Sequence, residues 1–93
     1  MRENAIERRL VTEAVKRGGL APKFVSPGLD GVPDRLLLFP GGKLAFVEVK
    51  APGEKPRPLQ RRRIDQLTAL GFRVYVLDSK EQIGEIMDEV QAL

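Results

Sequence analysis

Two charged side chains end an otherwise apolar segment near the middle of the chain. In Leu44–Lys50, Glu48 and Lys50 lie two residues apart, so in a strand both side chains point to the same face. A charge on a buried face is unfavourable unless an opposite charge or a metal ion compensates it. The pair therefore fits either a structural ion pair or a carboxylate that binds a cation beside a lysine.

A hairpin is expected to bring a second carboxylate to the same place. The runs Arg35–Phe39 and Leu44–Lys50 have strand length, and Pro40-Gly41-Gly42 between them supplies turn residues. With a three-residue loop, Asp34 lies directly opposite Glu48 on one face of the sheet. A two-residue loop would shift the pairing by one position and require a bulge beside Asp34.

Facing carboxylates repel each other unless a positive charge lies between them. At about 4 Å and an effective dielectric constant near 20, the repulsion is roughly 4 kcal/mol, and a divalent cation reverses its sign. The chain has no Cys and no His, which excludes zinc fingers, thiol nucleophiles and imidazole bases. Oxygen ligands alone favour a hard ion, Mg²⁺ or Mn²⁺. The alternative is that Asp34 is only a strand-entry residue after proline.

Two further polar residues lie where they could join this group. Glu7 borders the apolar stripe of a helix expected at Glu3–Arg17, although Asn4 and Glu7 also fit a capping box. Gln60 lies on the apolar side of a helix expected at Pro58–Gly71, near the N-terminal end, where anions are favoured. A role for this amide in capping a neighbouring backbone group fits the sequence equally well.

The elements that must position these residues follow from periodicity and turn residues. We expect helices at Glu3–Arg17, at Pro58–Gly71 and after the capping-box residues Ser79 and Gln82, and strands at Leu20–Val25, Arg35–Phe39, Leu44–Lys50 and Arg73–Leu77. The first three strands would form an antiparallel meander, with Pro22 keeping the first at an edge. A right-handed helical crossover would make the last strand parallel to its predecessor. The predicted fold class is α/β, a mixed sheet flanked by helices with an extra C-terminal helix.

Length and composition limit the remaining possibilities. With 93 residues, of which 42% are hydrophobic and 31% charged, the chain is expected to form one soluble globular domain. No apolar run is longer than Leu36–Phe39, which is far short of the roughly 20 residues that span a membrane. The first ten residues are charged and lack the apolar centre of a secretory signal.

Charge is unevenly distributed along the chain. Between Ala51 and Gln66 there are five cations and two acids, whereas Asp78–Leu93 holds one cation and five acids. Each run is consistent with a solvated helix face. The basic run directly follows the segment with the charged pair, and its cations, which could contact phosphates, are Lys55, Arg57, Arg61, Arg62 and Arg63.

In chain order, Glu7, Gly31-x-Pro33-Asp34, Glu48-x-Lys50 and Gln60 resemble the PD-(D/E)xK nuclease superfamily. The form GVPD…EVK…Q on so short a chain is similar to a stand-alone VRR-NUC domain of the kind found in bacteriophages. Each motif alone is weak, but four in this order and spacing are fairly specific. The resemblance covers nearly the whole chain and implies a restriction-endonuclease-like αβββαβ core, in agreement with the expected elements.

The resemblance implies a Mg²⁺- or Mn²⁺-dependent endonuclease that hydrolyses phosphodiester bonds in branched DNA such as four-way junctions. It further implies a homodimer in the cytoplasm of a bacterial or phage-infected cell. The implied metal ligands are Asp34, Glu48, the backbone carbonyl of Val49, and Glu7 directly or through water. Lys50 would position or activate the attacking water, and Gln60 would orient it.

Two other interpretations remain open. In the first, the chain is a non-catalytic nucleic-acid-binding module whose carboxylates form structural ion pairs. In the second, it is a subunit of a larger DNA-processing assembly whose partner supplies specificity. Substitution of Asp34 or Lys50 separates the first from a nuclease, because only a nuclease would lose cleavage and keep DNA binding.

Overall fold

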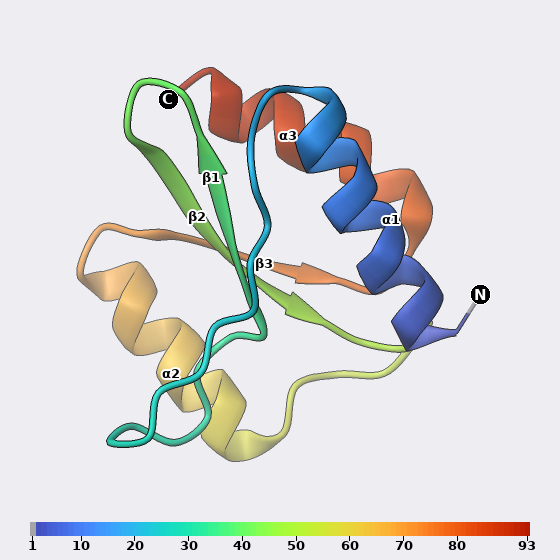
Figure 1. The fold of residues 1–93 in the computed structure, drawn as a ribbon. Coiled ribbons are helices and arrows are strands. Elements are labelled where there is room, and N and C mark those ends of the chain that lie inside the picture. Colours follow the sequence, from blue (N-terminus) through green and yellow to red (C-terminus); the bar gives the residue numbers. More distant parts are fainter. Residues whose placement is uncertain (1) are drawn as a thin grey trace.

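The computed structural model describes Arg2–Leu93 and arranges this part of the chain as three helices around a three-stranded sheet (Figure 1). The elements in chain order are α1 (Glu3–Lys16), β1 (Arg35–Phe39), β2 (Lys43–Val49), α2 (Pro58–Ala69), β3 (Arg73–Leu77), a 3₁₀ turn (Lys80–Gln82) and α3 (Ile83–Gln91). None of these helices is long and apolar enough to cross a membrane.

The sheet has the order β1-β2-β3 and is mixed. β1 pairs with β2 in the antiparallel sense, and β2 pairs with β3 in the parallel sense, with α2 making the crossover between them. The predicted hairpin, the parallel crossover and the α/β fold class with its additional C-terminal helix are therefore confirmed.

The segment expected to be the first strand is irregular. Within Leu20–Val25, only Leu20 and Lys23 form isolated antiparallel bridges, both with β1. Pro22 has no N–H group to donate to a ladder, although its carbonyl accepts a hydrogen bond from the Leu36 amide at 3.0 Å. The segment thus lines the outer edge of β1 as predicted, without the regular pairing of a strand.

A three-residue loop joins β1 to β2. Phe39 pairs with Lys43, which leaves Pro40-Gly41-Gly42 as the connection. Gly41 and Gly42 have φ angles of +89° and +72°, a region that side-chain-bearing residues rarely adopt. The glycines therefore allow the tight loop, and the loop fixes the register of the whole hairpin.

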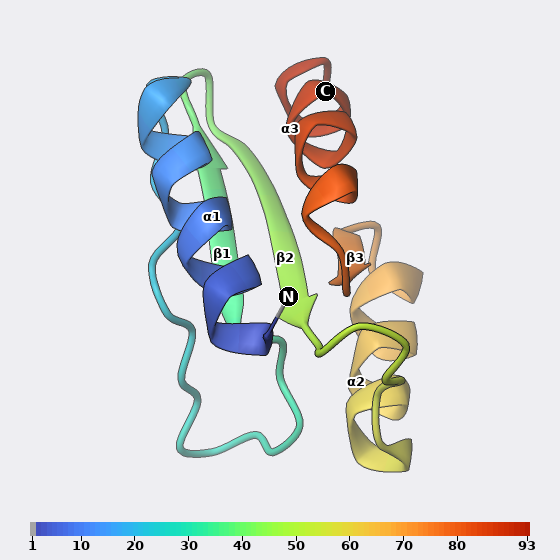
Figure 2. The same cartoon turned by 90° about the vertical axis from the view of Figure 1, so that its right-hand side faces the viewer.

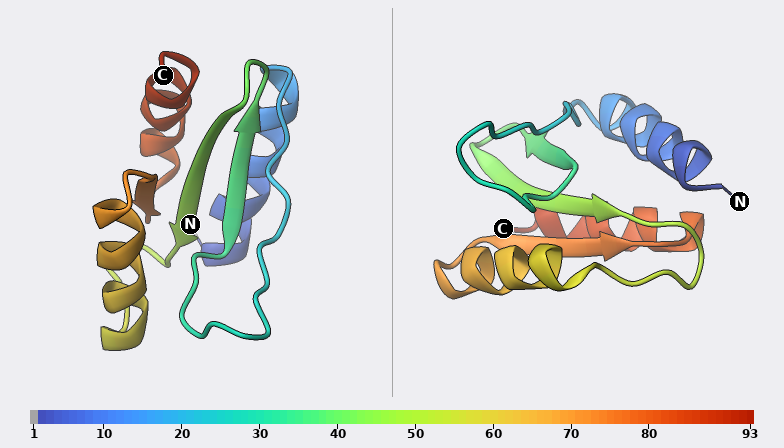
Figure 3. Two further views of the ribbon diagram at one scale, coloured as in Figure 1. Left: turned by 90° about the vertical axis from the view of Figure 1, so that its left-hand side faces the viewer. Right: turned by 90° about the horizontal axis from the view of Figure 1, so that it is seen from below.

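Helices cover the two faces of the sheet unequally (Figures 2 and 3). α1 and α3 pack on one face, where they and alternate strand residues form the main core; its largest fully buried members are Ile6, Leu10, Leu37, Val47, Val49, Leu77, Met87 and Val90. α2 lies on the other face. There Phe46 of β2 contacts Phe24 and Phe72, with ring centroids 5.6 Å apart in both pairs.

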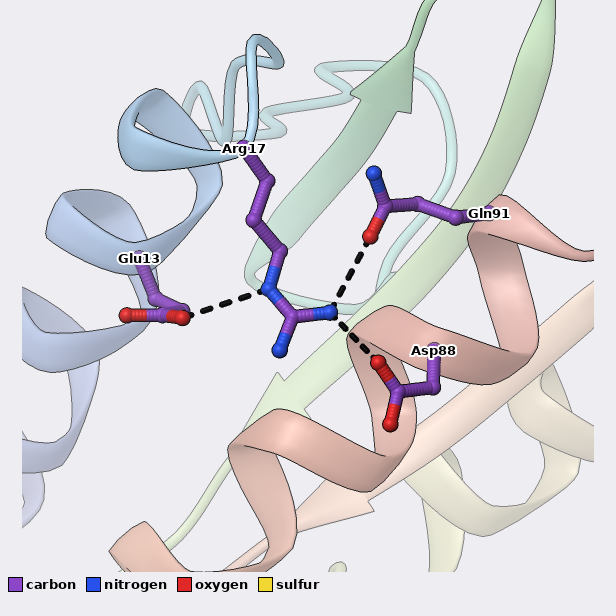
Figure 4. A network of polar contacts seen from close by, with 4 residues as sticks. All are labelled: Glu13, Arg17, Asp88 and Gln91. Carbon is purple, nitrogen blue, oxygen red and sulfur yellow. Dashed lines mark hydrogen bonds and ion pairs between the residues drawn. The ribbon is translucent and has the colours of Figure 1, made fainter.

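A charged cluster joins the two helices of the main core (Figure 4). The Arg17 guanidinium, just after α1, donates to Glu13 Oε1 at 3.2 Å, to Asp88 Oδ1 at 2.6 Å and to Gln91 Oε1 at 3.0 Å. Asp88 and Gln91 belong to α3, so these contacts tie the C-terminal end of α1 to the last turns of α3.

Candidate active site

The hairpin places two carboxylates side by side at the end of β2. Arg35 pairs with Val47, and one further step along this register sets Asp34 opposite Glu48. The Val49 amide donates a hydrogen bond to Asp34 Oδ2 at 2.9 Å, which holds the Asp34 side chain against β2. Of the two loop lengths that the sequence allows, the structure has the three-residue loop, which sets Asp34 opposite Glu48.

Glu48 is buried without a hydrogen bond to either carboxylate oxygen. Its side chain is 1% exposed, and both Oε1 and Oε2 lack a hydrogen-bond partner among the described residues. The Lys50 Nζ atom lies 3.3 Å from Glu48 Oε2, close enough for an ion pair but outside hydrogen-bonding geometry. A buried carboxylate in this state is costly unless something else compensates its charge.

The pKa of Glu48 reflects this environment. Burial, and after it the negative charge of Asp34, raise the pKa of Glu48 from 4.5 to about 7, although the positive charge of Lys50 opposes both effects. The site therefore disfavours the ionised form of Glu48 unless a further positive charge is supplied.

The residues present fit a hard divalent cation. Two unpartnered carboxylate oxygens next to a second carboxylate provide the oxygen donors that Mg²⁺ and Mn²⁺ prefer. Within Arg2–Leu93, no group of three acidic side chains could hold a metal ion on its own. Two carboxylates are nevertheless a usual number for Mg²⁺, which keeps several of its waters and binds substrate phosphates.

The structure pairs Glu7 with an arginine instead of with the two carboxylates. Arg35 Nε donates to Glu7 Oε2 at 2.8 Å, and the same guanidinium donates to the Ala21 carbonyl at 2.9 Å. Because Arg35 precedes an inward-facing Leu37 by two residues, its side chain lies on the α1 side of the sheet, opposite to Asp34. Arg2 is the N-cap of α1 and makes no side-chain cap, so the alternative capping box at Asn4 does not form.

Sequence reasoning overlooked Arg35. The available signal was a cation that directly follows Asp34 and starts an apolar strand, at a position whose side chain faces the core. Such a cation needs a buried partner, and Glu7 supplies it.

Gln60 is in the first turn of α2 and is 8% exposed. Its side-chain oxygen accepts a hydrogen bond from the Arg57 amide at 2.9 Å, so the capping interpretation holds for this atom. Since the oxygen must face that N–H group, the NH₂ end of the amide is the part that remains available as a donor.

The five cations of the basic run have different surroundings. Arg61 forms an ion pair with Asp65 at 3.1 Å, as the spacing of these residues predicts. Arg63 donates to the Asp30 carbonyl at 2.8 Å and to Gln66 Oε1 at 2.7 Å. The remaining three are exposed and form no ion pair within Arg2–Leu93; they are Lys55, Arg57 and Arg62.

Comparison with known proteins identifies the family. The sequence model of the VRR-NUC domain matches residues 3–81, which include the hairpin, both carboxylates, Lys50 and Gln60. The chain belongs to the VRR-NUC family. The VRR-NUC chain is also similar to "Putative nuclease p44" of Acyrthosiphon pisum secondary endosymbiont phage 1, with 59% identity over 81 residues, which is 87% of each protein.

A solved structure described as a VRR_NUC domain has the same fold. It superposes with a TM-score of 0.86 at 31% sequence identity, and the match covers 92% of this chain and 94% of that chain. The family resemblance carried by the four motifs is thus confirmed, and the chain is a nuclease domain of the VRR-NUC type. Nucleases of this type generally use a divalent metal ion.

Proposed function

We propose that residues 1–93 form one nuclease domain that hydrolyses phosphodiester bonds in branched DNA, such as four-way junctions, and depends on Mg²⁺ or Mn²⁺. The observation that carries the proposal is the environment of Glu48, which is buried opposite Asp34. Neither of its carboxylate oxygens has a hydrogen bond, and Lys50 Nζ lies 3.3 Å from one of them. An oxygen-only site next to a lysine suits metal-assisted phosphodiester hydrolysis and requires no histidine.

The proposed metal ligands are the Asp34 and Glu48 carboxylates and the Val49 carbonyl. A divalent cation bound there would neutralise the phosphate charge and lower the pKa of the attacking water. Glu7 is not included, because its Oε2 atom accepts a hydrogen bond from Arg35 Nε at 2.8 Å on the other face of the sheet.

Lys50 is the proposed catalytic cation. Its side chain is 12% exposed, and its ammonium is held near the reacting centre by the charge of Glu48. From this position the ammonium orients the attacking water and stabilises the negative charge that develops on the phosphate oxygens. The Gln60 NH₂ group, at the start of α2, is the proposed second donor for orienting the water.

Phosphate contacts are assigned to the basic run after β2. Lys55, Arg57 and Arg62 are exposed and form no ion pair within the described residues. Arg61, in contrast, forms an ion pair with Asp65. Such contacts bind DNA without regard to sequence and weaken with salt. Three of the aromatic rings pack on one another beside β2, and of these only Phe72 is exposed, so there is no row of rings for successive bases of a single strand.

A second copy of the chain is the proposed partner. The principal extents are 32 × 30 × 21 Å, which is too small for one copy to contact several arms of a junction. A homodimer with two-fold symmetry would present two sites to one branched substrate. Light scattering of the purified chain tests this, and a mass of one chain at all concentrations contradicts it.

The test of the activity is incubation with labelled four-way junctions, flaps and linear duplexes, with Mg²⁺ or Mn²⁺ against EDTA. We expect metal-dependent cutting of branched DNA, and loss of cutting in D34N and K50M by a factor of about 10² or more, because each removes a group that acts on the reacting phosphate. Both variants should still bind the junction in a gel-shift assay.

The Glu48–Lys50 ion pair at 3.3 Å also favours a second candidate, a nucleic-acid-binding module in which the pair is structural. In that case the wild-type chain binds DNA and cuts none of the substrates. A chain that cuts only after a partner protein is added would support the assembly-subunit interpretation instead.

A further inference from the structure

α2 carries Gln60 but is weakly anchored by its own packing. Gln60 and Ile64 are its only buried residues in this fully described helix, against three in α1 and four in α3. The chain reaches α2 through residues 50–57, which form no helix or strand. The position of its first turn relative to Asp34 therefore requires further contacts.

One such contact is a close approach of backbone to backbone at Gly31. A Cβ atom added to Gly31 would lie 2.9 Å from Leu59 Cγ and 3.0 Å from the Leu59 carbonyl oxygen. Gly31 also has a φ angle of +78°, which disfavours any other residue. The segment that leads into Asp34 thus lies directly against the first turn of α2.

The second contact is made by Arg63. Its Nε atom donates to the Asp30 carbonyl at 2.8 Å, and its Nη1 atom donates to Gln66 Oε1 at 2.7 Å. The first bond reaches from α2 to the residue before Gly31, while the second fixes the guanidinium on its own helix. In Figure 1 the segment before β1 crosses the N-terminal half of α2, and both contacts join these two parts of the chain.

We propose that Arg63 is a positioning residue for the nuclease reaction. With Gly31 it forms a tie, defined as the Arg63–Asp30 and Gly31–Leu59 contacts, that holds the first turn of α2 against the segment before Asp34. The tie keeps the Gln60 amide in place relative to the Asp34–Glu48 pair. This inference rests on the proposed function and reassigns Arg63 from phosphate binding to positioning.

The two roles of Arg63 predict opposite kinetic signatures. If Arg63 positions Gln60, R63Q lowers kcat by about 10-fold and leaves KM for the junction within about two-fold, because misplacement affects the reacting geometry and not DNA binding. If Arg63 contacts a phosphate, R63Q raises KM and reduces the salt slope of binding by about 1. R62Q, which alters the neighbouring exposed cation, provides the phosphate-contact signature for comparison.

Hydrogen exchange of the metal-free protein tests the tie independently of cleavage. In R63Q, the hydrogen-bonded amides of Arg61–Ile64 and the Phe24 amide, which donates to the Asp34 carbonyl at 2.8 Å, should exchange faster than in the wild type, while those of α3 are unchanged. R8Q, on the exposed side of α1, is the matched control and should change neither region. R63K should restore part of kcat, because a lysine ammonium can also donate to the Asp30 carbonyl.

Unchanged exchange in R63Q, or a raised KM with unchanged kcat, would overturn the tie. If the proposed function is wrong, the result differs: the wild-type chain cuts no DNA, whatever the exchange data show. G31A provides a second route to the same result. It should reproduce the faster exchange at Arg61–Ile64, because its methyl group displaces the first turn of α2.

Discussion

Glu48 has a buried carboxylate whose charge is compensated only in part. Its side chain is 1% exposed, Asp34 faces it across the hairpin, and Lys50 Nζ lies 3.3 Å away. A cation that binds between the two carboxylates removes their repulsion and supplies partners for the Glu48 oxygens. The features that destabilise the metal-free site are thus the same ones that favour cation binding.

The raised pKa of Glu48 makes the stability of the metal-free protein depend on pH. The pKa of Glu48 is 4.5 in the unfolded chain and about 7 in the folded one, so below pH 4.5 Glu48 is neutral in both states and the stability is highest. As pH rises through 7, the free energy of unfolding falls by roughly 3 kcal/mol, because the unfolded chain loses this proton more readily than the folded one. Urea unfolding in EDTA between pH 4.5 and 8 measures this.

The matched variant for that experiment is E48Q, which has nearly the same shape and cannot ionise. We expect its free energy of unfolding to fall less over this pH range than that of the wild type, and to exceed the wild-type value at pH 8. Parallel pH profiles for the two proteins would contradict a strongly raised pKa at Glu48.

The positions of some candidate site residues could be predicted from the sequence, and those of others could not. The placement of Asp34, Glu48 and Lys50 near one another followed from strand alternation and one loop length, which are local properties. The pairing of Glu7 with Arg35 depends on how α1 docks on the sheet, and the contact of Arg63 with Asp30 depends on where α2 lies. Neither arrangement leaves a periodic signal in the sequence.

Among the elements, those with strong apolar periodicity were predicted closely, and Leu20–Val25 was not. The predicted strand Arg73–Leu77 has the observed bounds, and β2 begins and ends one residue earlier than expected. Leu20–Val25 pairs with β1 at two isolated bridges only, because Pro22 interrupts the donors. The proline thus accounts for both the edge position of this segment and its irregular pairing.

The Arg17 cluster (Figure 4) yields a prediction about how α1 and α3 are held together. R17Q and D88N should each lower the melting temperature, because each removes one charge of the ion pair whose 2.6 Å contact joins the two helices. The double variant should lose less than the sum of the two single losses, since both remove the same interaction. Thermal unfolding of the four proteins measures this.

Cleavage provides the control for the Arg17 variants. The cluster joins α1 to α3, on the face of the sheet opposite to α2, so junction cutting at a temperature well below unfolding should be unchanged. Strictly additive losses in melting temperature would show that Arg17 and Asp88 do not stabilise the fold through each other.

Across the whole molecule, α3 and α2 differ in charge. The 3₁₀ turn and α3 carry exposed acids, which are Glu81, Glu85, Asp88 and Glu89. The basic run lies instead on and before α2, on the other face of the sheet (Figure 1). This asymmetry favours the approach of a polyanion to the α2 side, where Glu48 lies near the end of β2 and Lys50 follows it.

Calorimetric titration of Mn²⁺ into the DNA-free protein at pH 8 tests whether Asp34 and Glu48 bind a cation together. We expect binding to the wild-type chain, with affinity reduced by about 10-fold or more in both D34N and E48Q, because each removes one of the two charged ligands. R17Q, remote from the site, should bind as the wild type does. Equal Mn²⁺ affinity in the wild type and in both site variants would show that these carboxylates are not the ligands.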